Sequence, residues 1–265
     1  MDENNNCFAL VTGASRGLGK AIAFELAKKK KNLILVSLPG EGLKSYCTSL
    51  ESYGIKVVSY EADLCNKEAI FALINWIRGS FKVNILINNI GLGGTHEFEK
   101  SSIDLIHQSI HLNITVMAMI THQLLPLLKQ HKSSYILNVS SIASFCPIGY
   151  KAIYSASKVF IYYFTKSLAQ ELKNSKVHMS TVFPGPMKTN TDSIKRLEKH
   201  GFIGKMGLEP TEKVAQIAIN KLFKRKPIII IGKTNYALRI LLSILPDWIR
   251  LPLVTNSVRK ELEIE

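Results

Sequence analysis

Seven short apolar segments recur along the chain and alternate with longer segments of helical length. Several are continuous apolar runs, such as Leu33–Val36 and Ile228–Ile231, which are typical of strands buried on both faces of a parallel sheet. Alternation of such strands with helices indicates right-handed crossovers within one sheet. We therefore predict an α/β, doubly wound fold with a seven-stranded, mainly parallel sheet and helices on both faces.

The positions of the expected elements follow from this pattern. The strands are expected at residues 7–12, 32–37, 55–60, 83–88, 134–140, 177–183 and 227–231. The helices are expected at about residues 17–30, 41–53, 66–79, 101–130, 152–174 and 210–225. No linker, repeat or change in composition divides the chain. Residues 1–265 are therefore expected to form a single domain, with residues 233–265 as a C-terminal apolar extension of it.

The composition is globular and basic. Hydrophobic residues make up 46% of the chain and charged residues 20%, which excludes a disordered or collagen-like protein. The 34 lysines and arginines exceed the 20 acidic residues, so the net charge is +14. That excess suits phosphates, nucleic acid or a lipid surface. The run Lys28–Lys31 ends a predicted helix, where cations suit the helix dipole, so we expect no nucleic acid as a partner.

The cysteines and the N-terminus favour a cytoplasmic protein. No C-x-x-C pair occurs among Cys7, Cys47, Cys65 and Cys146, which are expected to be reduced thiols. The polar N-terminus lacks the basic and apolar regions of a signal peptide. No run of 18 apolar residues is present, so a membrane-spanning helix is not expected.

The segment Val11–Gly19 joins the first predicted strand to the first helix and carries Gly13, Gly17 and Gly19. Glycines in such a turn let the backbone approach a pyrophosphate, which then lies at the positive N-terminus of the helix. The position of this glycine-rich loop at the first strand–helix junction predicts a dinucleotide site.

A hydrolase is the alternative interpretation of the same loop. Residues 13–17 also match the G-x-S-x-G pattern of a nucleophile elbow, for which Asp192 and His200 are candidate partners. That elbow normally follows several strands, whereas this one follows the first, and it gives Gly19 no role. A serine hydrolase therefore remains only a remote alternative.

Tyr154 and Lys158 are four residues apart in a predicted helix and therefore share one face. A cation beside a phenol favours the phenolate and lowers the pKa of the tyrosine. Lowering that pKa from about 10 to about 7 corresponds to roughly 4 kcal/mol and would suit acid–base chemistry at neutral pH. Taken alone, such a pair is common and is far more often two solvated side chains on a helix surface.

Other polar or Gly/Pro residues follow the later predicted strands. Asn88–Gly91, Ser141 and Pro184–Pro186 each end a strand, and Asn113 lies in the helix after the first of these. The carboxyl ends of parallel strands meet at one edge of a sheet, where ligands bind. We therefore expect these residues to converge with the glycine-rich loop.

Together these motifs resemble the short-chain dehydrogenases/reductases over about residues 7–232. The matching segments are Thr12–Gly19, Asp63-Leu64, Asn88–Gly91, Asn113, Ser141, Tyr154 with Lys158, and Pro184-Gly185. The resemblance implies a Rossmann-type core and nicotinamide-dependent carbonyl/alcohol chemistry. One departure is Ile90, which replaces the alanine of the family's Asn-Asn-Ala-Gly and which we attribute to core packing.

The resemblance also implies roles for individual residues. Tyr154 would be the general acid/base, and Lys158 would bind the nicotinamide ribose and lower the pKa of the tyrosine. Ser141 would hold the substrate oxygen, Asn113 would organise a water-linked proton relay, and Asp63 would contact the adenine. The complete set of expected cofactor-binding residues is Gly13, Ser15, Arg16, Gly17, Leu18, Gly19, Ser37, Asp63, Leu64, Asn89, Gly91, Tyr154, Lys158, Pro184, Gly185 and Thr189.

The second predicted strand bears on the choice of cofactor. An acid at its end would bind the adenosine ribose and repel a 2′-phosphate, but none occurs before Glu41. Arg16 in the glycine-rich loop could meet the 2′-phosphate, and Ser37 could add a hydroxyl donor. We therefore predict NADP(H), with ketone reduction as the favoured direction.

Other features of the long predicted helices concern metals and subunits. His107, His111 and His122 fall roughly on one face, but no H-E-x-x-H pattern or acidic neighbour supports a metal site, and none is expected. The apolar stripe Phe160–Phe164 follows the Tyr–Lys pair. In the resembled family two long helices form a dimer interface, so a homodimer or homotetramer is expected.

The C-terminal extension is unusually apolar over residues 236–254. Arg239 and Ser243 mark one narrow polar face of its first helical part, and Trp248 and Leu253 follow after a proline. Three alternatives remain open for this segment: peripheral docking at a bilayer interface, covering of a lipid-sized substrate pocket, or packing on its own or another subunit.

The expected function is that of an NADPH-dependent ketoreductase acting on a hydrophobic, long-chain or lipid-like small molecule with a carbonyl or alcohol group. Hydride would pass from the nicotinamide to the carbonyl carbon while Tyr154 protonates the oxygen. The loop after the sixth predicted strand favours such a substrate through its apolar residues Met187, Phe202, Ile203, Met206 and Leu208. The alternative from another class is a non-catalytic nucleotide-sensing or scaffold protein on the same fold.

Overall fold

The computed structural model describes residues 6–187, 189, 207–259 and 261–262. Five residues considered above lie outside these ranges: Asp192, His200, Phe202, Ile203 and Met206.

Seven strands form one sheet in the order β3-β2-β1-β4-β5-β6-β7, and every neighbouring pair is parallel. The strands are β1 (Cys7–Thr12), β2 (Asn32–Ser37), β3 (Val57–Glu61), β4 (Lys82–Asn88), β5 (Ser134–Val139), β6 (Val177–Phe183) and β7 (Ile228–Ile230). This architecture confirms the doubly wound, Rossmann-type fold predicted from the sequence. The strand order reverses between β1 and β4, and ligands of such folds bind at the carboxyl ends of the strands at that point.

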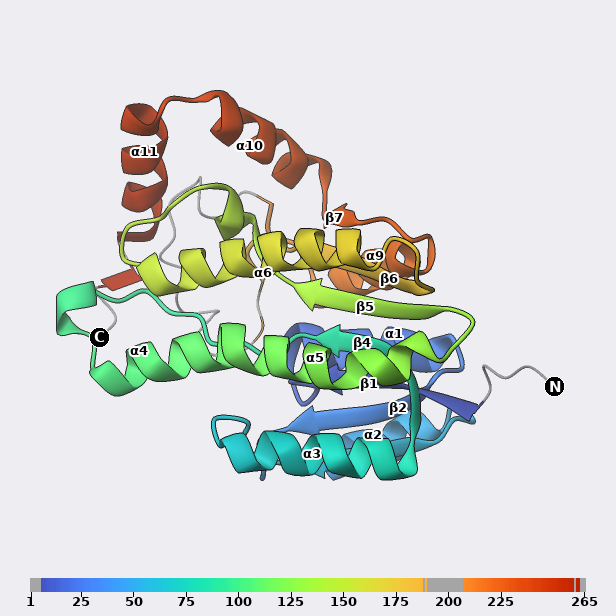
Figure 1. Cartoon of the computed structure of the whole chain (residues 1–265). Helices are drawn as coiled ribbons and strands as arrows, with labels where there is room; N and C mark the ends of the chain where they lie inside the picture. Colours follow the sequence, from blue (N-terminus) through green and yellow to red (C-terminus); the bar gives the residue numbers. More distant parts are fainter. Residues whose placement is uncertain (1–5, 188, 190–206, 260, 263–265) are drawn as a thin grey trace.

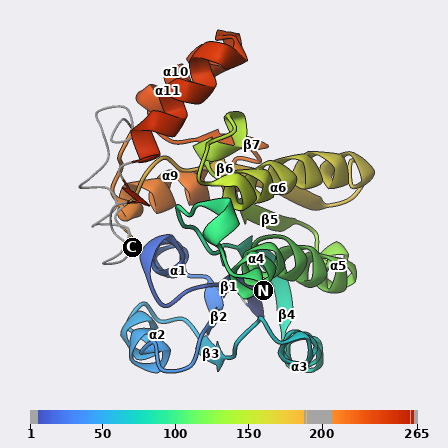
Figure 2. The ribbon, with the colours of Figure 1, turned by 90° about the vertical axis from the view of Figure 1, so that its left-hand side faces the viewer.

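Helices cover both faces of the sheet (Figures 1 and 2). One face carries α1 (Gly17–Lys28), α2 (Leu43–Glu51) and α9 (Thr211–Phe223), and the other carries α3 (Lys67–Ser80), α5 (Val116–Lys129) and α6 (Ala152–Glu171). Consecutive strand residues serve opposite faces: Leu33 and Leu35 pack on the first face, and Ile34 packs on the second. Burial on both faces explains why the strands are continuous apolar runs.

The predicted helix 101–130 differs from the observed structure in one respect. It consists of α4 (Ile103–Ile110), a π-helical turn at His111–Thr115, and α5. Hydrophobic periodicity runs through all three parts, so it gave no sign of the extra residue in this turn. Such turns are often found at functional sites, and this one contains Asn113.

The stretch Ile103–Lys129 is long and apolar enough, by length and composition alone, to cross a membrane. In the fold it packs against the sheet, where Val116, Ile120 and Leu124 are fully or almost fully buried.

Two helices follow β7 and form the C-terminal arm, α10 (Lys233–Ile244) and α11 (Asp247–Arg259). Figure 1 shows the arm at the top of the molecule, beyond the layers that cover the sheet. Polar contacts attach it at three points: Asn235 donates to the Gly207 carbonyl at 3.1 Å, the Arg239 guanidinium lies 4.8 Å from the centroid of the Phe145 ring, and the Gly149 amide donates to Thr255 Oγ1 at 3.0 Å. The arm therefore rests on the loop between β5 and α6.

Candidate active site

The structure brings Asn113, Ser141, Tyr154 and Lys158 to the carboxyl edge of the sheet. Ser141 follows β5, Asn113 lies in the π-helical turn, and the other two lie in the first turns of α6. The loop after β4 links them. A Cβ atom added to Gly91 would lie 2.9 Å from Asn113 Oδ1 and 3.4 Å from Lys158 Nζ. Gly91 therefore leaves room for two groups that a side chain would displace.

Lys158 is a buried ammonium without an acidic partner. Its side chain is 5% exposed, and Nζ donates to the Val139 carbonyl oxygen at 3.1 Å. Burial lowers the pKa of Lys158 from its usual 10.5 to about 8. Among the described residues no carboxylate offsets this penalty. The ammonium therefore has donor capacity left for a ligand, and it lies 5.6 Å from the centroid of the Tyr154 ring.

Ser141 is oriented by the backbone that follows it. Its Oγ accepts a hydrogen bond from the Ala143 amide at 3.1 Å, which caps the short 3-10 turn Ile142–Phe145. Among the described residues its own hydroxyl proton has no acceptor. The hydroxyl can therefore donate to the oxygen of a bound molecule.

Asn113 connects the π-helical turn to two neighbouring elements. Its Oδ1 accepts from the Leu92 amide at 2.6 Å, and its Nδ2 donates to the Leu92 carbonyl at 2.9 Å. Nδ2 also donates to Ser157 Oγ at 3.0 Å, and Ser157 in turn donates to the Tyr154 carbonyl at 2.7 Å. Asn113 thus fixes the loop after β4 and the first turn of α6 at the same time.

Tyr154 borders a cavity of about 70 Å³ beside this loop. A Cβ atom on Gly93 would lie 3.5 Å from Tyr154 Cε2, so the ring stands close against the loop. Tyr150, at the mouth of the cavity, has a left-handed backbone with φ 64°. Most of the remaining wall is apolar: Leu92, Phe98, Leu105, Ile106, Ala152 and Ile153.

The glycine-rich loop has no room for side chains at its turn. Gly13 and Gly17 have φ of +66° and +54°, in the left-handed region that favours glycine. A Cβ atom on Gly19 would lie 2.0 Å from the Gly13 carbonyl oxygen. Arg16, at the N-cap of α1, makes no side-chain capping bond. The first amides of α1 are therefore left available to an anion.

Asn89 supports the glycine-rich loop from behind. Its Nδ2 donates to the carbonyl oxygens of Thr12 at 3.0 Å and Gly13 at 3.1 Å, and its amide donates to Thr12 Oγ1 at 3.0 Å. The side chain predicted to lie along the cofactor therefore shapes the loop that would hold the cofactor. The adjacent Ile90 packs against the core, as expected for the one departure from the family pattern.

The turn after β3 places Asp63 in the open and Leu64 in the core. Asp63 is exposed, and its Oδ1 accepts from the Cys65 amide at 2.9 Å. Leu64 is buried, and its carbonyl oxygen lies 3.1 Å from His111 Nε2. Because its side chain is buried in the core, Leu64 could contact a ligand only through its backbone.

The structure adds Glu41, which the sequence reasoning had set aside. Its carboxylate accepts a hydrogen bond from Ser15 Oγ, and its Oε1 lies 3.4 Å from Arg16 NH1. Gly40 and Gly42, with φ of +78° and +70°, turn the chain so that Glu41 reaches the loop. The sequence signal for this contact was the Gly-Glu-Gly segment at residues 40–42, shortly after the end of β2. An acid therefore does lie beside the arginine predicted to contact a 2′-phosphate.

Ser37, the other residue expected at this end of the site, ends β2 and is 3% exposed. Its Oγ donates to the Leu38 carbonyl at 3.0 Å. The hydroxyl expected to contact the cofactor is thus bonded within its own turn.

The segment after β6 closes the other side of the site. The Ile142 amide donates to the Pro184 carbonyl at 3.0 Å, which joins the loops after β5 and β6. A Cβ atom on Gly185 would lie 2.6 Å from the Gly207 carbonyl oxygen, so this position admits only glycine without rearrangement. The Thr189 side chain stands over Gly17, at 2.9 Å from where its Cβ would be. Thr189 therefore faces the glycine-rich loop.

These residues fit a nicotinamide dinucleotide on three observations of the structure. The helix N-terminus behind Gly17 and Gly19 is uncapped by side chains, which suits a pyrophosphate. The Lys158 ammonium is buried with one carbonyl acceptor, which suits ribose hydroxyls. Gly91 has no side chain, so it leaves space for a ligand beside Lys158, where a Cβ atom would lie 3.4 Å from Nζ.

The histidines of the long helix lie apart from the site. His107 and His122 are exposed, and His111 contacts Leu64 as described. Within the ranges that the structure describes, no group of three His, Cys, Asp or Glu side chains is arranged to hold a metal ion.

Comparisons with known proteins agree with this geometry. The sequence pattern of the short chain dehydrogenase family matches residues 7–200. The chain is 31% identical to a very-long-chain 3-oxoacyl-CoA reductase of Anas platyrhynchos over 71% of this chain and 62% of that protein. It is 34% identical to the human 17-beta-hydroxysteroid dehydrogenase type 3 over 69% of this chain and 59% of that protein. These alignments thus span about three fifths of the relatives' length.

A longer alignment and a solved structure extend the likeness. Hydroxysteroid dehydrogenase-like protein 1 of Gallus gallus is 30% identical over 91% of this chain and 73% of that protein. A short-chain dehydrogenase from Sphingobium yanoikuyae, solved in complex with NADPH, has the same fold with a TM-score of 0.77 and 24% identity, covering 91% of this chain and 96% of that one. The match over most of the chain confirms the family predicted from the motifs: the chain belongs to the short-chain dehydrogenase family.

Proposed function

We propose that the chain is an NADPH-dependent ketoreductase that reduces the carbonyl group of a hydrophobic, long-chain or lipid-like substrate. One observation carries this proposal. A buried lysine without an acidic partner, a tyrosine and a serine with a hydroxyl proton to donate meet beside an uncapped, glycine-rich helix N-terminus. That arrangement offers a site for a dinucleotide and, next to it, donors for a carbonyl oxygen.

The cofactor would lie along the carboxyl edge of the sheet. Its pyrophosphate would meet the amides behind Gly17 and Gly19, and its nicotinamide ribose would accept from Lys158. When bound, the reduced nicotinamide supplies the hydride for the carbonyl carbon. NADPH is supported by Arg16 in the glycine-rich loop and by related folds solved with NADPH.

The residues of this chain would manage the proton and the orientation. Ser141 donates a hydrogen bond to the carbonyl oxygen and so holds the carbonyl in place. Tyr154 gives its phenolic proton to that oxygen as negative charge develops there. The Lys158 ammonium, beside the tyrosine ring, stabilises the phenolate left behind. Asn113 keeps the loop and α6 in register through Leu92 and Ser157, and its position suits a water-linked path that returns a proton to Tyr154.

The wall of the cavity beside Tyr154 favours an apolar substrate. It is lined mainly by aliphatic and aromatic side chains of the loop after β4, α4 and the start of α6. Relatives named for very-long-chain 3-oxoacyl-CoA and for hydroxysteroid substrates support the same class. The substrate class is therefore proposed as a ketone on a long acyl chain or a lipid-like ring system.

We also propose how the protein associates in the cell. The stripe on α6 exposes Phe160 and Tyr163, which suits a homodimer or homotetramer. The C-terminal arm exposes Ile244 and Trp248 more strongly, which suits peripheral contact of a cytoplasmic protein with a membrane.

The decisive experiment is NADPH oxidation followed over a series of ketones graded by chain length. We expect turnover that rises with chain length and a slower reaction with NADH. NADPH binding without turnover on any ketone would instead favour a nucleotide-sensing protein. Ester cleavage without cofactor would favour the hydrolase.

A further inference from the structure

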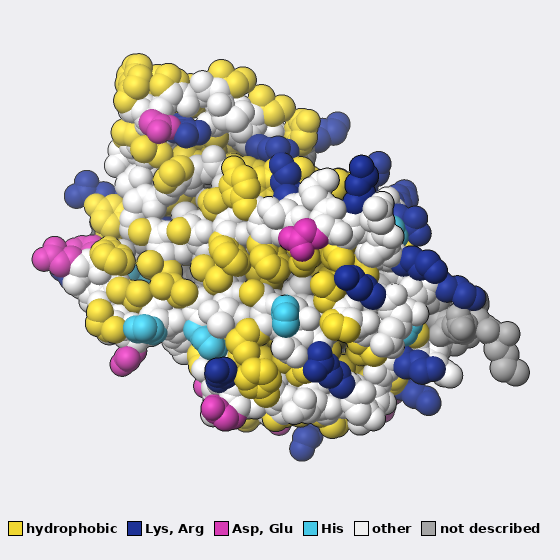
Figure 3. Space-filling view, in the orientation of Figure 1, with side chains coloured by type: hydrophobic (Ala, Val, Ile, Leu, Met, Phe, Trp, Pro, Cys, Tyr) yellow, Lys and Arg dark blue, Asp and Glu magenta, His cyan; other side chains and the backbone are white. Residues whose placement is uncertain are grey.

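The amino-terminal edge of the sheet, opposite Tyr154, carries a concentration of positive charge. Every helix-to-strand loop of the sheet ends there because all strands are parallel. These loops contain no Asp or Glu. Their basic residues are Lys29, Lys30, Lys31, Lys56, Lys132, Lys173, Lys176, Lys224, Arg225 and Lys226. Figure 3 shows Lys and Arg side chains gathered on the right of the molecule, where Figure 1 places this edge.

Two of these loops end neighbouring helices in the same way. α1 and α9 pack against each other, and each ends in a basic triplet, Lys29–Lys31 or Lys224–Lys226. The middle residue of each triplet, Lys30 or Arg225, has a left-handed backbone with φ 56°. In both, its amide donates to the carbonyl three residues earlier at 2.8 Å, and the next amide donates five residues back at 3.1 Å in α1 and 3.0 Å in α9.

Glycine is the residue that this helix ending favours. A lysine and an arginine at these two positions therefore accept backbone strain that glycine would avoid. The helix dipole favours a cation near each C-terminus, but it does not require the strained position to be basic. The third described non-glycine residue with positive φ, Tyr150, lies at the mouth of the cavity beside Tyr154. Such strain is typically kept where a site needs it.

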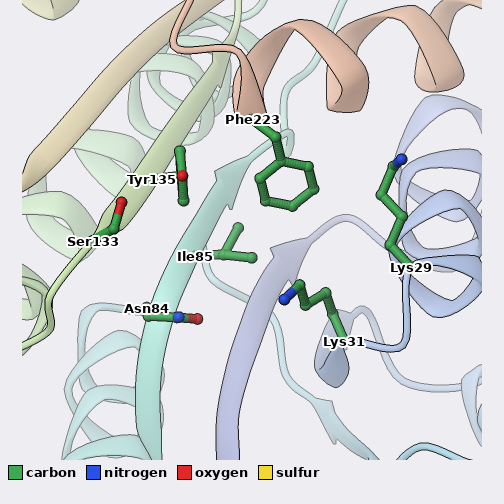
Figure 4. Close-up of a pocket in the computed structure, with 7 residues that line it drawn as sticks. All are labelled: Lys29, Lys31, Asn84, Ile85, Ser133, Tyr135 and Phe223. Carbon is green, nitrogen blue, oxygen red and sulfur yellow. The ribbon is translucent and has the colours of Figure 1, made fainter. Parts of the chain in front are cut away.

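A cavity of about 270 Å³ lies between the ends of these helices. We call it the basic pocket, and its lining residues are Lys29, Lys31, Asn84, Ile85, Ser133, Tyr135 and Phe223. Figure 4 shows them arising from the ends of α1 and α9 and from the starts of β4 and β5, with the Phe223 ring above Ile85 and the Lys31 side chain reaching toward them.

The wall of the basic pocket has an aromatic part and a polar part. The Tyr135 and Phe223 rings meet edge to face with centroids 5.2 Å apart, and Lys31 Nζ lies 6.0 Å from the Phe223 centroid. Asn84 is 6% exposed. Ser133 Oγ is buried and has no hydrogen-bond partner among the described residues. A buried hydroxyl without a partner is costly unless a ligand or water completes it.

Lys29 and Lys31 also keep their charges uncompensated, because neither forms an ion pair within the described residues. Two free ammonium groups are suited to a doubly charged oxyanion. The adjacent rings are suited to a planar apolar group. A polyanion such as nucleic acid would use the surrounding cations but would not need this enclosed aromatic wall.

We propose that the basic pocket binds a small aromatic phosphate monoester, with the phosphate at Lys29 and Lys31 and the ring against Phe223 and Tyr135. The site lies at the opposite end of the strands from the glycine-rich loop and shares no residue with it. It therefore does not depend on the proposed reaction.

The test is calorimetric binding of phenyl phosphate to the full chain. We expect binding that weakens at least about tenfold in the double variant Lys29→Ala/Lys31→Ala, because two charge-assisted contacts are lost. The control Lys56→Ala/Lys173→Ala removes the same charge from exposed positions of the same edge and should leave binding unchanged. Arg16→Ala, in the glycine-rich loop, should also leave it unchanged, which separates this site from the cofactor site.

Two further experiments decide the ligand class. Phe223→Leu should reduce the preference for phenyl phosphate over inorganic phosphate. Phosphatidylcholine vesicles containing phosphatidic acid carry the same monoester on a membrane. Flotation with them that is lost in Lys29→Ala/Lys31→Ala would assign the phosphate to a lipid headgroup rather than to a soluble ester.

The proposal is overturned if phenyl phosphate does not bind, or if both double variants weaken it equally, since the edge would then act only as diffuse charge. It is also overturned if inorganic phosphate binds as well as phenyl phosphate and Phe223→Leu changes neither.

Discussion

The first turns of α6 and the C-terminal arm lie on either side of the loop after β5, yet they treat their side chains in opposite ways. In α6 Ser157 and Lys158 are buried and bonded: Ser157 accepts from Asn113, and the backbone of Lys158 accepts from Ser140 Oγ at 2.7 Å. In the arm the apolar groups are exposed, with Ile244 at 74% and Trp248 at 77%. The first turns of α6 thus bury polar groups and fix them by hydrogen bonds, whereas the C-terminal arm leaves apolar side chains exposed to solvent.

The two regions are nevertheless joined. Lys151, at the N-cap of α6, lies 3.0 Å from a carboxylate oxygen of Glu261, which is 3% exposed and also accepts from Thr95 Oγ1. Asn235 at the start of α10 is fully buried and donates to the Gly207 and Ile231 carbonyls at 3.1 and 2.8 Å. Asn235 of the arm and Glu261 just beyond it are therefore part of the framework around the site, while Ile244 and Trp248 of the arm are exposed.

The largest effect should come from Tyr154→Phe, which removes one hydroxyl group from the first turns of α6. We expect kcat on a ketone substrate to fall at least about 100-fold, the lower range for a positioned acid–base group. The fold and NADPH binding should stay close to those of the parent chain, because the ring itself still packs against Gly93. Tyr163→Phe, an exposed position on the same helix, is the matched control. Near-normal turnover by Tyr154→Phe would remove the tyrosine from the mechanism.

The sheet and most of the candidate site could be predicted from the sequence, because short apolar runs and local motifs indicate them. Continuous apolar runs located all seven strands. The bounds of β3 are shifted by one or two residues, β4 starts one residue earlier, β5 ends one residue earlier, and β7 is shorter by one residue at each end. The glycine-rich loop and the residues after β4, β5 and β6 reached one edge because parallel strands place all carboxyl ends together.

The parts that escaped prediction depend on contacts distant in sequence or on a single extra residue. The π-helical turn at Asn113 does not alter hydrophobic periodicity, so the sequence predicted one uninterrupted helix. Glu41 reaches Ser15 only because two glycines turn the chain after β2. The depressed pKa of Lys158 depends on its complete burial in the tertiary structure, which no spacing of residues reveals.

Burial of Lys158 leads to the second prediction, a stability that depends on pH. Its pKa in the folded chain is about 8, against 10.5 when it is solvated. The folded chain therefore holds this proton less tightly, and the buried charge opposes folding below about pH 8. As pH rises from about 8 to 10.5 the unfolded chain keeps more protons, so the free energy of unfolding rises.

Lys158→Met should accordingly raise the free energy of unfolding at pH 7 by about 1–3 kcal/mol while it impairs carbonyl reduction. That gain should be smaller at pH 10 and approach zero only well above pH 10.5, where the lysine is neutral in both states. Urea unfolding of the cofactor-free chain at both pH values measures it. Lys166→Met, on an exposed part of α6, should show no such pH dependence. An equal gain at pH 7 and pH 10 would mean that the charge is not the cause.

A third, smaller effect concerns the glycine-rich loop, where Arg16 and Glu41 form a partly exposed ion pair. Arg16→Ala should weaken NADPH by about 1.5–3 kcal/mol and NADH by less, because only NADPH offers a second phosphate for a charge-assisted contact. Glu41→Gln should act the other way and improve NADPH over NADH by about two- to fivefold, as expected for loss of one partly exposed like charge. Fluorescence titration of both cofactors measures this. Equal changes for NADPH and NADH in either variant would mean that this pair does not read the 2′-phosphate.

The least effect on catalysis should come from the apolar face of the arm. Truncation of residues 233–265 would not isolate that face, because it also removes Asn235 and Glu261, which are built into the framework of the site. The double variant Ile244→Ser/Trp248→Ser changes only exposed side chains. If the arm docks at a bilayer, flotation of the chain with anionic vesicles should weaken at least about tenfold, since each buried apolar side chain contributes about 1.5–3 kcal/mol. Turnover of a short, soluble ketone should stay within about twofold, because neither side chain contacts the catalytic residues.

Ile103→Ser, an exposed apolar position on α4, is the matched control and should float like the parent chain. Binding should also fall with salt, because basic residues near an anionic surface add about 1 kcal/mol each. If the parent chain does not float even at low salt, the exposed face belongs instead to a subunit contact. In that case the same double variant would change the oligomeric state measured by light scattering.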